Sequence, residues 1–296
     1  MSRTADQNGR AVAGPADLDG TTIVITGASS GIGAAAARAL AARGATVVPI
    51  GRSPARTAAV AAELGVEPLI ADFARFDDVR TLAERLLARC PTIDVLVHNA
   101  GAMIPERRVT EDGHELTLQS NYLAPFLLQQ LLHERLRASA ARVVVTSSVG
   151  HRFGRLRLDD LEYANRSYSP FGAYGTSKLA DLLFARELAR QAPETGITAV
   201  AFHPGAVGSA FASDAHGAAG LLYQTAFGRR LTLTNEQGAA PLVHLASLPD
   251  PWSVNGQYMS KLRPNARSSR QARDRALGRE LWELTETMLE LPVREA

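Results

Sequence analysis

Cysteine is almost absent from this sequence, which has a single thiol, Cys90, among 296 residues. One thiol cannot form an intramolecular disulfide, and no group of cysteine and histidine residues has the spacing of a zinc site. We therefore expect no bound metal and a reducing compartment such as the cytoplasm. Cys90 precedes Pro91 and is interpreted as an ordinary residue at the end of a helix.

An excess of charge of one sign is also absent, since 32 basic residues face 30 acidic ones and the net charge is +2. The small arginine excess is spread along the chain, so a nucleic-acid partner is not expected. No segment reaches the roughly 18 apolar residues that a membrane span needs, and residues 1–20 lack the apolar core of a signal peptide. We expect a soluble protein with a flexible, polar tail over residues 1–19.

Short apolar segments alternate with segments of helical spacing. The apolar segments are continuous rather than alternating, which is typical of strands buried on both faces of a parallel sheet. The pattern predicts an α/β fold: a single Rossmann-type, doubly wound parallel sheet with helices on both faces. Pro49 is the exception, because a central strand would lose a ladder hydrogen bond there. Strands are predicted within 21–27, 45–51, 66–73, 93–101, 141–148 and 196–205, and helices within 34–42, 79–89, 122–136 and 179–191.

The remaining segments have less regular patterns. Residues 152–171 and 206–235 show no clear period, and long irregular segments in α/β domains often contact substrate. Apolar residues at helical spacing in 268–291 predict a final helix, with Trp282 covering its packed side. We expect one domain over residues 20–292, with a substrate loop or lid at about 206–235.

The stretch ITGASSGIG, residues 25–33, joins a predicted strand to an alanine-rich helix through three glycines. Free N–H groups and the dipole at a helix start favour an anion such as a pyrophosphate. Gly27 permits the turn, Gly31 lets a ligand approach the backbone, and Gly33 lets the helix pack closely. The spacing differs from the G-x-G-x-x-G fingerprint, and a plain tight turn is the alternative interpretation.

The tip of the second predicted strand bears on the choice of cofactor. An acid at this position binds a free ribose 2′-hydroxyl, whereas an arginine accommodates a 2′-phosphate. Here the sequence continues Gly51, Arg52, Ser53, with no carboxylate. We therefore predict NADP(H) in preference to NAD(H); the alternative is that Arg52 is an ordinary exposed arginine.

Tyr174 and Lys178 are four residues apart, which places them on one face of a helix, about 5–6 Å apart at Cβ. A free tyrosine has a pKa near 10, and a neighbouring ammonium stabilises the phenolate. Tyr174 is therefore a candidate general acid for carbonyl reduction, or general base for alcohol oxidation. The pair alone is weak evidence, because any helix can carry it by chance.

Taken together, the motifs resemble those of the short-chain dehydrogenase/reductase family, in their family order along residues 20–260. The extended segment before Tyr174 and the closing LWELTETML resemble the retinol-dehydrogenase-like branch. Membrane-bound members of that branch often begin with a hydrophobic anchor, which this sequence lacks. The matching motifs are TGASSGIG (26–33), NAG (99–101), Asn121, VVVTSS (143–148), Tyr174 with Lys178, and HPGAVGS (203–209).

The resemblance implies a role for each matching residue. Tyr174 would be the acid/base, and Lys178 would bind the nicotinamide ribose and lower the pKa of Tyr174. Ser148 would hold the substrate oxygen, and Asn121 would anchor a water in a proton relay. The implied cofactor-binding residues are Gly27, Ser29, Ser30, Gly31, Ile32, Gly33, Arg52, Asp72 and Phe73 beside the adenine, Asn99, Ala100, Gly101, Tyr174, Lys178, and Pro204, Gly205 and Val207 beside the nicotinamide.

Structural alternatives exist for several of these residues. Ser148 could simply end a strand, Asn121 could be a satisfied buried amide, and Asp72 could belong to a turn. His98 and His203 are interpreted as packing residues at strand ends. His151 lies nearest to the expected substrate site, and a structural role is favoured for it as well.

The implied activity is hydride transfer between NADP(H) and an apolar alcohol, aldehyde or ketone. Two alternatives stay open: a non-catalytic NADP(H)-sensing protein, and an epimerase or dehydratase that recycles its nicotinamide. The resemblance also suggests a homodimer or homotetramer formed through helices near 122–136 and 174–190, with a monomer as the alternative.

Overall fold

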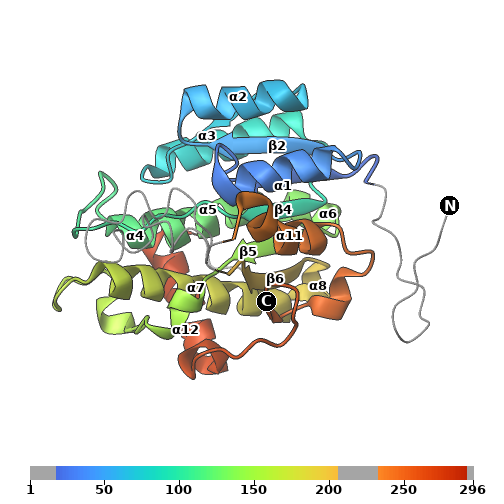
Figure 1. The fold of residues 1–296 in the computed structure, drawn as a ribbon. Coiled ribbons are helices and arrows are strands. Elements are labelled where there is room, and N and C mark those ends of the chain that lie inside the picture. The colour runs from blue at the N-terminus through green and yellow to red at the C-terminus, as the bar shows by residue number, and fades with distance from the viewer. Residues whose placement is uncertain (1–17, 206–232, 292–296) are drawn as a thin grey trace.

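The computed structural model describes residues 18–205 and 233–291, and Figure 1 draws the remaining residues as a thin grey trace. The expectations for most of the tail, for most of the 206–235 segment and for Val207 therefore lie outside the described residues. Leu18 already belongs to the folded body: it is buried, and its N–H donates to the carbonyl of Arg43 at 2.9 Å.

Within the described residues, seven parallel strands form one sheet in the order β3-β2-β1-β4-β5-β6-β7. The chain moves outward from β1 to β3, returns to β4 beside β1, and then moves outward in the other direction, which is the doubly wound arrangement. The predicted fold class is confirmed. The strands are β1 (Thr22–Thr26), β2 (Thr46–Gly51), β3 (Leu69–Ile70), β4 (Val95–His98), β5 (Arg142–Thr146), β6 (Thr198–His203) and β7 (Tyr258–Ser260).

Pro49 lies inside β2, as the apolar pattern requires, at a position where its missing N–H costs little. The carbonyl of Ile50 accepts from Ala28 on the β1 side, and the carbonyl of Gly51 accepts from Ala71 on the β3 side. Backbone polar groups alternate sides along a strand, so Pro49 faces β3. Because β3 pairs with β2 only from Leu69 onward, Pro49 interrupts no ladder hydrogen bond there.

Helices cover both faces of the sheet (Figure 1). Ile23 and Ile25 of β1 pack with α1 and α11 on one face, whereas Val24 packs on the other face with α3, α5, α7 and α12. This burial on both faces explains the continuous apolar pattern. The helices and helical turns are α1 (Gly31–Ala41), α2 (Pro54–Leu64), α3 (Phe76–Arg89), α4 (Leu116–Leu118), η1 (Gln119–Leu123), α5 (Ala124–Leu131), α6 (His133–Ala138), η2 (Val149–Arg152), η3 (Leu158–Asp160), α7 (Pro170–Arg190), α8 (Ala192–Thr195), α11 (Asn235–Ala246), η4 (Pro251–Val254), η5 (Gln271–Arg273) and α12 (Arg275–Met288).

The predicted final helix forms as α12 and packs on α5 and α7. The Trp282 ring lies edge-on to Phe126 of α5 at a centroid distance of 4.7 Å and stacks on Phe184 of α7 at 5.8 Å. Trp282 therefore covers the packed side of this helix, as predicted. All but one of the eight residues of α5 are buried, so this part of the expected subunit interface is already covered largely within one chain.

Several described elements were not predicted from the sequence, among them α2, α11 and β7. Helix α11 contains an internal proline, Pro241, which weakens the helical pattern, although Thr234 forms a complete capping box with Gln237. Strand β7 has only three residues, too few for a periodic signal. Within the irregular segment 152–171, the structure places only short helical turns before α7 begins at Pro170.

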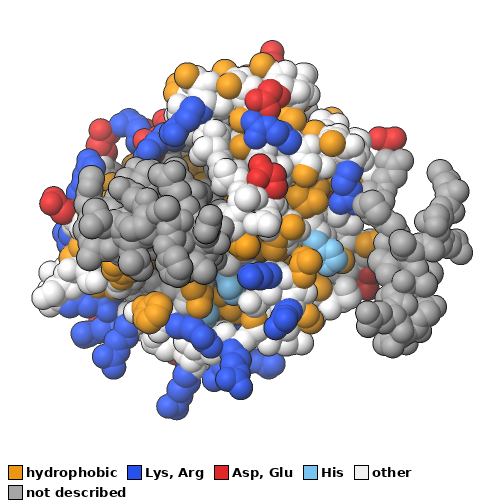
Figure 2. Space-filling model, in the orientation of Figure 1, with side chains coloured by type: hydrophobic (Ala, Val, Ile, Leu, Met, Phe, Trp, Pro, Cys, Tyr) orange, Lys and Arg blue, Asp and Glu red, His pale blue; other side chains and the backbone are white. Residues whose placement is uncertain are grey.

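Charged side chains of both signs lie on the face shown in Figure 2, with lysine and arginine gathered along its lower edge. Among the described helices, none is long and apolar enough to cross a membrane.

Candidate functional site

The glycine-rich loop connects β1 to α1 at the edge where the parallel strands end. Gly27 and Gly31 have φ angles of 68° and 57°, which residues with a Cβ atom rarely adopt. At Gly33, an added Cβ would lie 2.3 Å from the carbonyl oxygen of Gly27, so no larger residue fits. Ser30, the N-cap residue of α1, makes no side-chain capping bond. The loop therefore has the features of an anion-binding helix start.

A hydroxyl and an amide hold this loop against the end of β4. The Thr26 hydroxyl donates to the carbonyl of Val97 and accepts from the N–H groups of Asn99 and Ala100, both at 3.0 Å. In return, Nδ2 of Asn99 donates to the carbonyl of Thr26 at 3.1 Å. Asn99 was predicted to bind the cofactor, whereas these bonds, here called the clasp, were not predicted. The clasp holds the glycine-rich loop against the end of β4.

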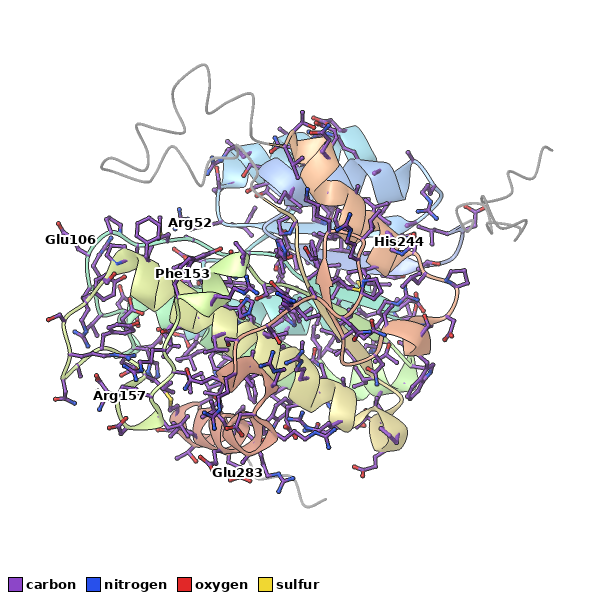
Figure 3. All side chains as sticks on the ribbon, turned by 60° about the horizontal axis from the view of Figure 1, so that its bottom comes forward. Arg52, Glu106, Phe153, Arg157, His244 and Glu283 are labelled. Atoms are coloured by element: carbon purple, nitrogen blue, oxygen red, sulfur yellow. The ribbon has the colours of Figure 1, made fainter. Side chains whose placement is uncertain are left out.

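The tip of β2 lies directly beside the glycine-rich loop. A Cβ added at Gly51 would lie 2.7 Å from the Cβ of Ser29, so the two segments touch. Arg52 follows and is exposed, and it is labelled in Figure 3. Its position next to the loop is the one from which a side chain can reach the adenosine ribose.

Asp72 and Phe73 have clear structural roles in addition to the role predicted for them. The Asp72 carboxylate accepts from the N–H of Ala74 at 3.0 Å, and the backbone N–H of Asp72 donates to the Asp78 carboxylate at 2.9 Å. Phe73 is buried in the hydrophobic core. The turn interpretation of Asp72 is therefore correct for its local contacts.

Tyr174 and Ser148 meet where η2 packs against α7. The Ser148 side chain acts through hydrogen bonding to lower the pKa of Tyr174, and its hydroxyl accepts from the N–H of Gly150 at 3.0 Å. A Cβ at Gly150 would lie 3.2 Å from the Tyr174 ring, so the turn fits closely over the ring. Ser148 thus ends a strand and also contacts the candidate acid/base.

Lys178 is buried beneath Tyr174 and is not a lone cation. Its Nζ lies 5.8 Å from the centroid of the Tyr174 ring, donates to the carbonyl of Thr146 at 3.2 Å, and forms an ion pair with Asp181 at 2.8 Å. Burial acts to lower the pKa of Lys178, but Asp181 and Tyr174 raise it by more, so its pKa is raised.

Burial and the neighbouring groups act on the pKa of Tyr174 in opposite directions. Burial raises it, whereas Lys178 and the hydrogen bond from Ser148 lower it, and Asp181 raises it further; the pKa is raised overall. Lys178 therefore acts on the pKa of Tyr174 in the predicted direction, but burial has the larger effect.

Asn121 lies in the π-helical turn η1, a distortion frequent at functional sites. Its Oδ1 accepts from the N–H of Ala102 at 2.9 Å, and its Nδ2 donates to the carbonyl of Ala102 and to the Ser177 hydroxyl, both at 2.9 Å. These bonds tie η1 to the chain after Gly101 and to α7, so Asn121 is a satisfied buried amide next to the candidate site.

The three histidines near the motifs have packing roles. His98 is buried at the end of β4 against Phe184, and His203 bonds Ser260 and the N–H of Gly205. His151 bonds the carbonyl of Ser148 through Nδ1 at 2.7 Å and accepts from the N–H of Ser269 through Nε2 at 3.2 Å. His151 therefore holds the Ser148 turn against the C-terminal part of the chain.

The described residues bring together Ser148, Tyr174 and Lys178, with Asn121 and the 99–101 segment beside them. The glycine-rich loop and Arg52 lie along the same edge of the sheet. Pro204 and Gly205 follow β6 at this edge. No group of acidic, cysteine or histidine side chains suited to a metal occurs in the described ranges. Asp181 was not singled out from the sequence, although an acid three residues after Lys178 on a helix is a usable signal.

Comparison with known proteins identifies the relatives of the chain. A family model described as short chain dehydrogenase matches residues 21–218. A Streptomyces sp. (strain C5) protein, provisionally assigned as the daunorubicin C-13 ketoreductase DnrU, is 43% identical over 273 residues, covering 90% of this chain and 91% of that protein. Retinol dehydrogenase 12 of Mus musculus is 38% identical over 278 residues, covering 90% of this chain and 86% of that protein.

Solved structures share the fold. An uncharacterized protein from Mycobacterium paratuberculosis has a TM-score of 0.76 and 32% identity, covering 94% of this chain and 97% of that chain. A protein from Beutenbergia cavernae, provisionally assigned as an NAD(P)-dependent gluconate 5-dehydrogenase and holding NADP at low occupancy, has a TM-score of 0.67 and 28% identity, covering 84% of this chain and 97% of that chain.

Proposed function

We infer the function from one premise: this chain belongs to the short-chain dehydrogenase/reductase family, in its retinol-dehydrogenase-like branch, which is a family of oxidoreductases. We propose that it is an NADP(H)-dependent enzyme that interconverts an apolar carbonyl compound and its alcohol. The observation that carries the proposal is the placement of three side chains: a Cβ at Gly150 would lie 3.2 Å from both the Ser148 hydroxyl oxygen and the Tyr174 ring, and the buried Lys178 Nζ lies 5.8 Å from the centre of that ring.

The residues present fit a nicotinamide dinucleotide. Gly33 leaves no room for a side chain under the loop, and the uncapped start of α1 offers N–H groups to a pyrophosphate. Arg52 supports NADP(H) because a guanidinium matches phosphate geometry. The bound cofactor would supply the hydride, and the protein would supply position and electrostatics.

The side chains divide the remaining chemistry. Tyr174 would donate its phenolic proton to the substrate oxygen during reduction, and Ser148 would donate a second hydrogen bond to the same oxygen. The charge of Lys178 would stabilise the phenolate that remains. Alcohol oxidation is the reverse, with the Tyr174 phenolate as the base.

Apolar side chains around Tyr174 support an apolar substrate. Val149 of η2 is 49% exposed, Phe153 directly after η2 is 75% exposed, and Phe171, one turn before Tyr174 on α7, is 56% exposed. Phe153 is labelled in Figure 3. Exposed aromatic groups next to a reactive site are suited to bind an apolar ligand, which agrees with the ketone and retinol named for two relatives.

The test is an NADPH-consumption screen with aliphatic and aromatic aldehydes, polycyclic ketones and retinaldehyde. Tyr174→Phe should lower turnover about 10²–10⁴-fold with little effect on NADPH binding. Tyr163→Phe is the matched control, because it removes another phenol that bonds α7, through Thr176. Unchanged turnover in Tyr174→Phe would refute the assignment. Tight NADPH binding without consumption would favour a sensor, and substrate conversion without net consumption would favour an epimerase or dehydratase.

A further inference from the structure

Lys178 and Asp181 form a buried ion pair on α7 whose position the proposed chemistry does not explain. The side chains are 5% and 4% exposed, and Nζ lies 2.8 Å from Oδ2. Burying one charge without a partner is costly, and a close counter-charge offsets much of that cost. The carboxylate also fixes the direction of the lysine, since Nζ is held between Asp181 and the carbonyl of Thr146.

We propose that Asp181 is a positioning residue for the reaction: its buried carboxylate, 2.8 Å from Nζ, holds Lys178 in place near the Tyr174 ring and puts a fixed negative charge next to the Tyr174–Lys178 pair. This inference rests on the proposed function, because it gives Asp181 a role through the candidate acid/base. The signal in the sequence is an acid three residues after the lysine, and the structure buries both side chains.

Apart from Tyr174 and Lys178, few titratable groups in the described residues interact with Asp181. Tyr122 of η1 is the other described group whose pKa Asp181 raises, and its hydroxyl is already bonded to Thr285 of α12 at 2.8 Å. Glu286 of α12 acts on Tyr122 as well. From β5, the contact with Lys178 is the carbonyl of Thr146, which does not titrate. Burial raises the pKa of Asp181 to about 6 against the opposing effect of Lys178.

The sign of the effect does not depend on which group of the pair titrates. Asp181 raises the pKa values of both Tyr174 and Lys178. Replacing the carboxylate with a neutral amide therefore lowers both, and the coupled pair releases its first proton at lower pH. In alcohol oxidation the rate rises with pH as this proton is lost, so the rising limb of log kcat/KM moves to lower pH.

The experiment compares pH profiles of alcohol oxidation in wild type, Asp181→Asn, Asp181→Glu and Glu187→Gln. Asp181→Asn should shift the limb down by roughly one pH unit, and Asp181→Glu should restore most of the wild-type profile. Glu187→Gln is the matched control, because Glu187 is also buried on α7 and pairs with the residue three positions later, Arg190. An unshifted limb in a folded Asp181→Asn protein, or an equal shift in Glu187→Gln, would overturn the inference.

A second readout does not need turnover. Phenolate absorbance is measured against pH in the wild type and in Tyr174→Phe, both without cofactor. The difference between the two curves is the titration of Tyr174. The same difference measured in the Asp181→Asn background should have its midpoint at lower pH. If the protein consumes no NADPH but the midpoint moves, the proposed function fails and the coupling stands; if turnover occurs and the midpoint is unmoved, the coupling fails alone.

Discussion

Replacing Thr26 with valine tests how the glycine-rich loop is held in place. The Thr26 side chain is fully buried at the end of β1, and its hydroxyl accepts from two backbone N–H groups, those of Asn99 and Ala100, at 3.0 Å each. Valine has nearly the same shape but no acceptor, so both donors lose their partner.

The expected cost follows from the two stranded donors. An unsatisfied buried N–H costs roughly 1–3 kcal/mol, and Asn99 and Ala100 are only partly buried, so water can satisfy part of the loss. We expect Thr26→Val to destabilise the protein by about 3 kcal/mol. For a domain of this size that lowers the melting temperature by roughly 6–12 °C.

The assay is thermal and urea unfolding of Thr26→Val beside a matched Thr198→Val variant. Thr198 is 2% exposed on β6, and its hydroxyl has no hydrogen-bond partner among the described residues. The same substitution there should change stability by less than about 0.5 kcal/mol or increase it. Equal effects in the two variants would show that the clasp contributes nothing and would refute the reasoning.

Three further predictions address the cofactor, the core and the pH dependence. Arg52→Ala should weaken NADPH binding by about 10–100-fold and leave NADH binding unchanged in fluorescence titrations, whereas Arg80→Ala, an exposed arginine on α3, should change neither; equal loss of both cofactors would contradict the 2′-phosphate assignment. Trp282→Ala should cost about 3–5 kcal/mol in urea unfolding because the ring packs on Phe126 and Phe184; a cost below about 1 kcal/mol would mean that α12 is dispensable. Burial lowers the pKa of His98 from 6.5 to about 4, so the unfolded chain binds the extra proton and stability falls by up to about 3 kcal/mol as the pH drops through that interval. Urea unfolding of His98→Gln at a series of pH values should lack this part of the loss, and parallel curves for the variant and the wild type would refute the assignment.

Much of the fold could be predicted from the sequence because it follows from local patterns of residues. Strands buried on both faces must be apolar throughout, and the segments around Ile23 and Val143 had this pattern. A chain that turns sharply into a helix must have glycine where a side chain has no room, as at Gly33. Tyr174 and Lys178 were recognisable as a pair because helical geometry places residues four apart on one face. Each of these signals spans only a few residues.

Tertiary packing determined the long-range contacts and pKa values that no short sequence segment encodes. The clasp between Thr26 and Asn99 joins residues 73 positions apart, and the tolerance of Pro49 depends on where the neighbouring strand β3 begins. The raised pKa of Tyr174 results from burial that outweighs Lys178, a balance set by every element packed around the ring. The sequence by itself determined which chemical groups are available and which local shapes they adopt; only the folded chain determined their distances, their exposure to water and therefore the free energies of their charges.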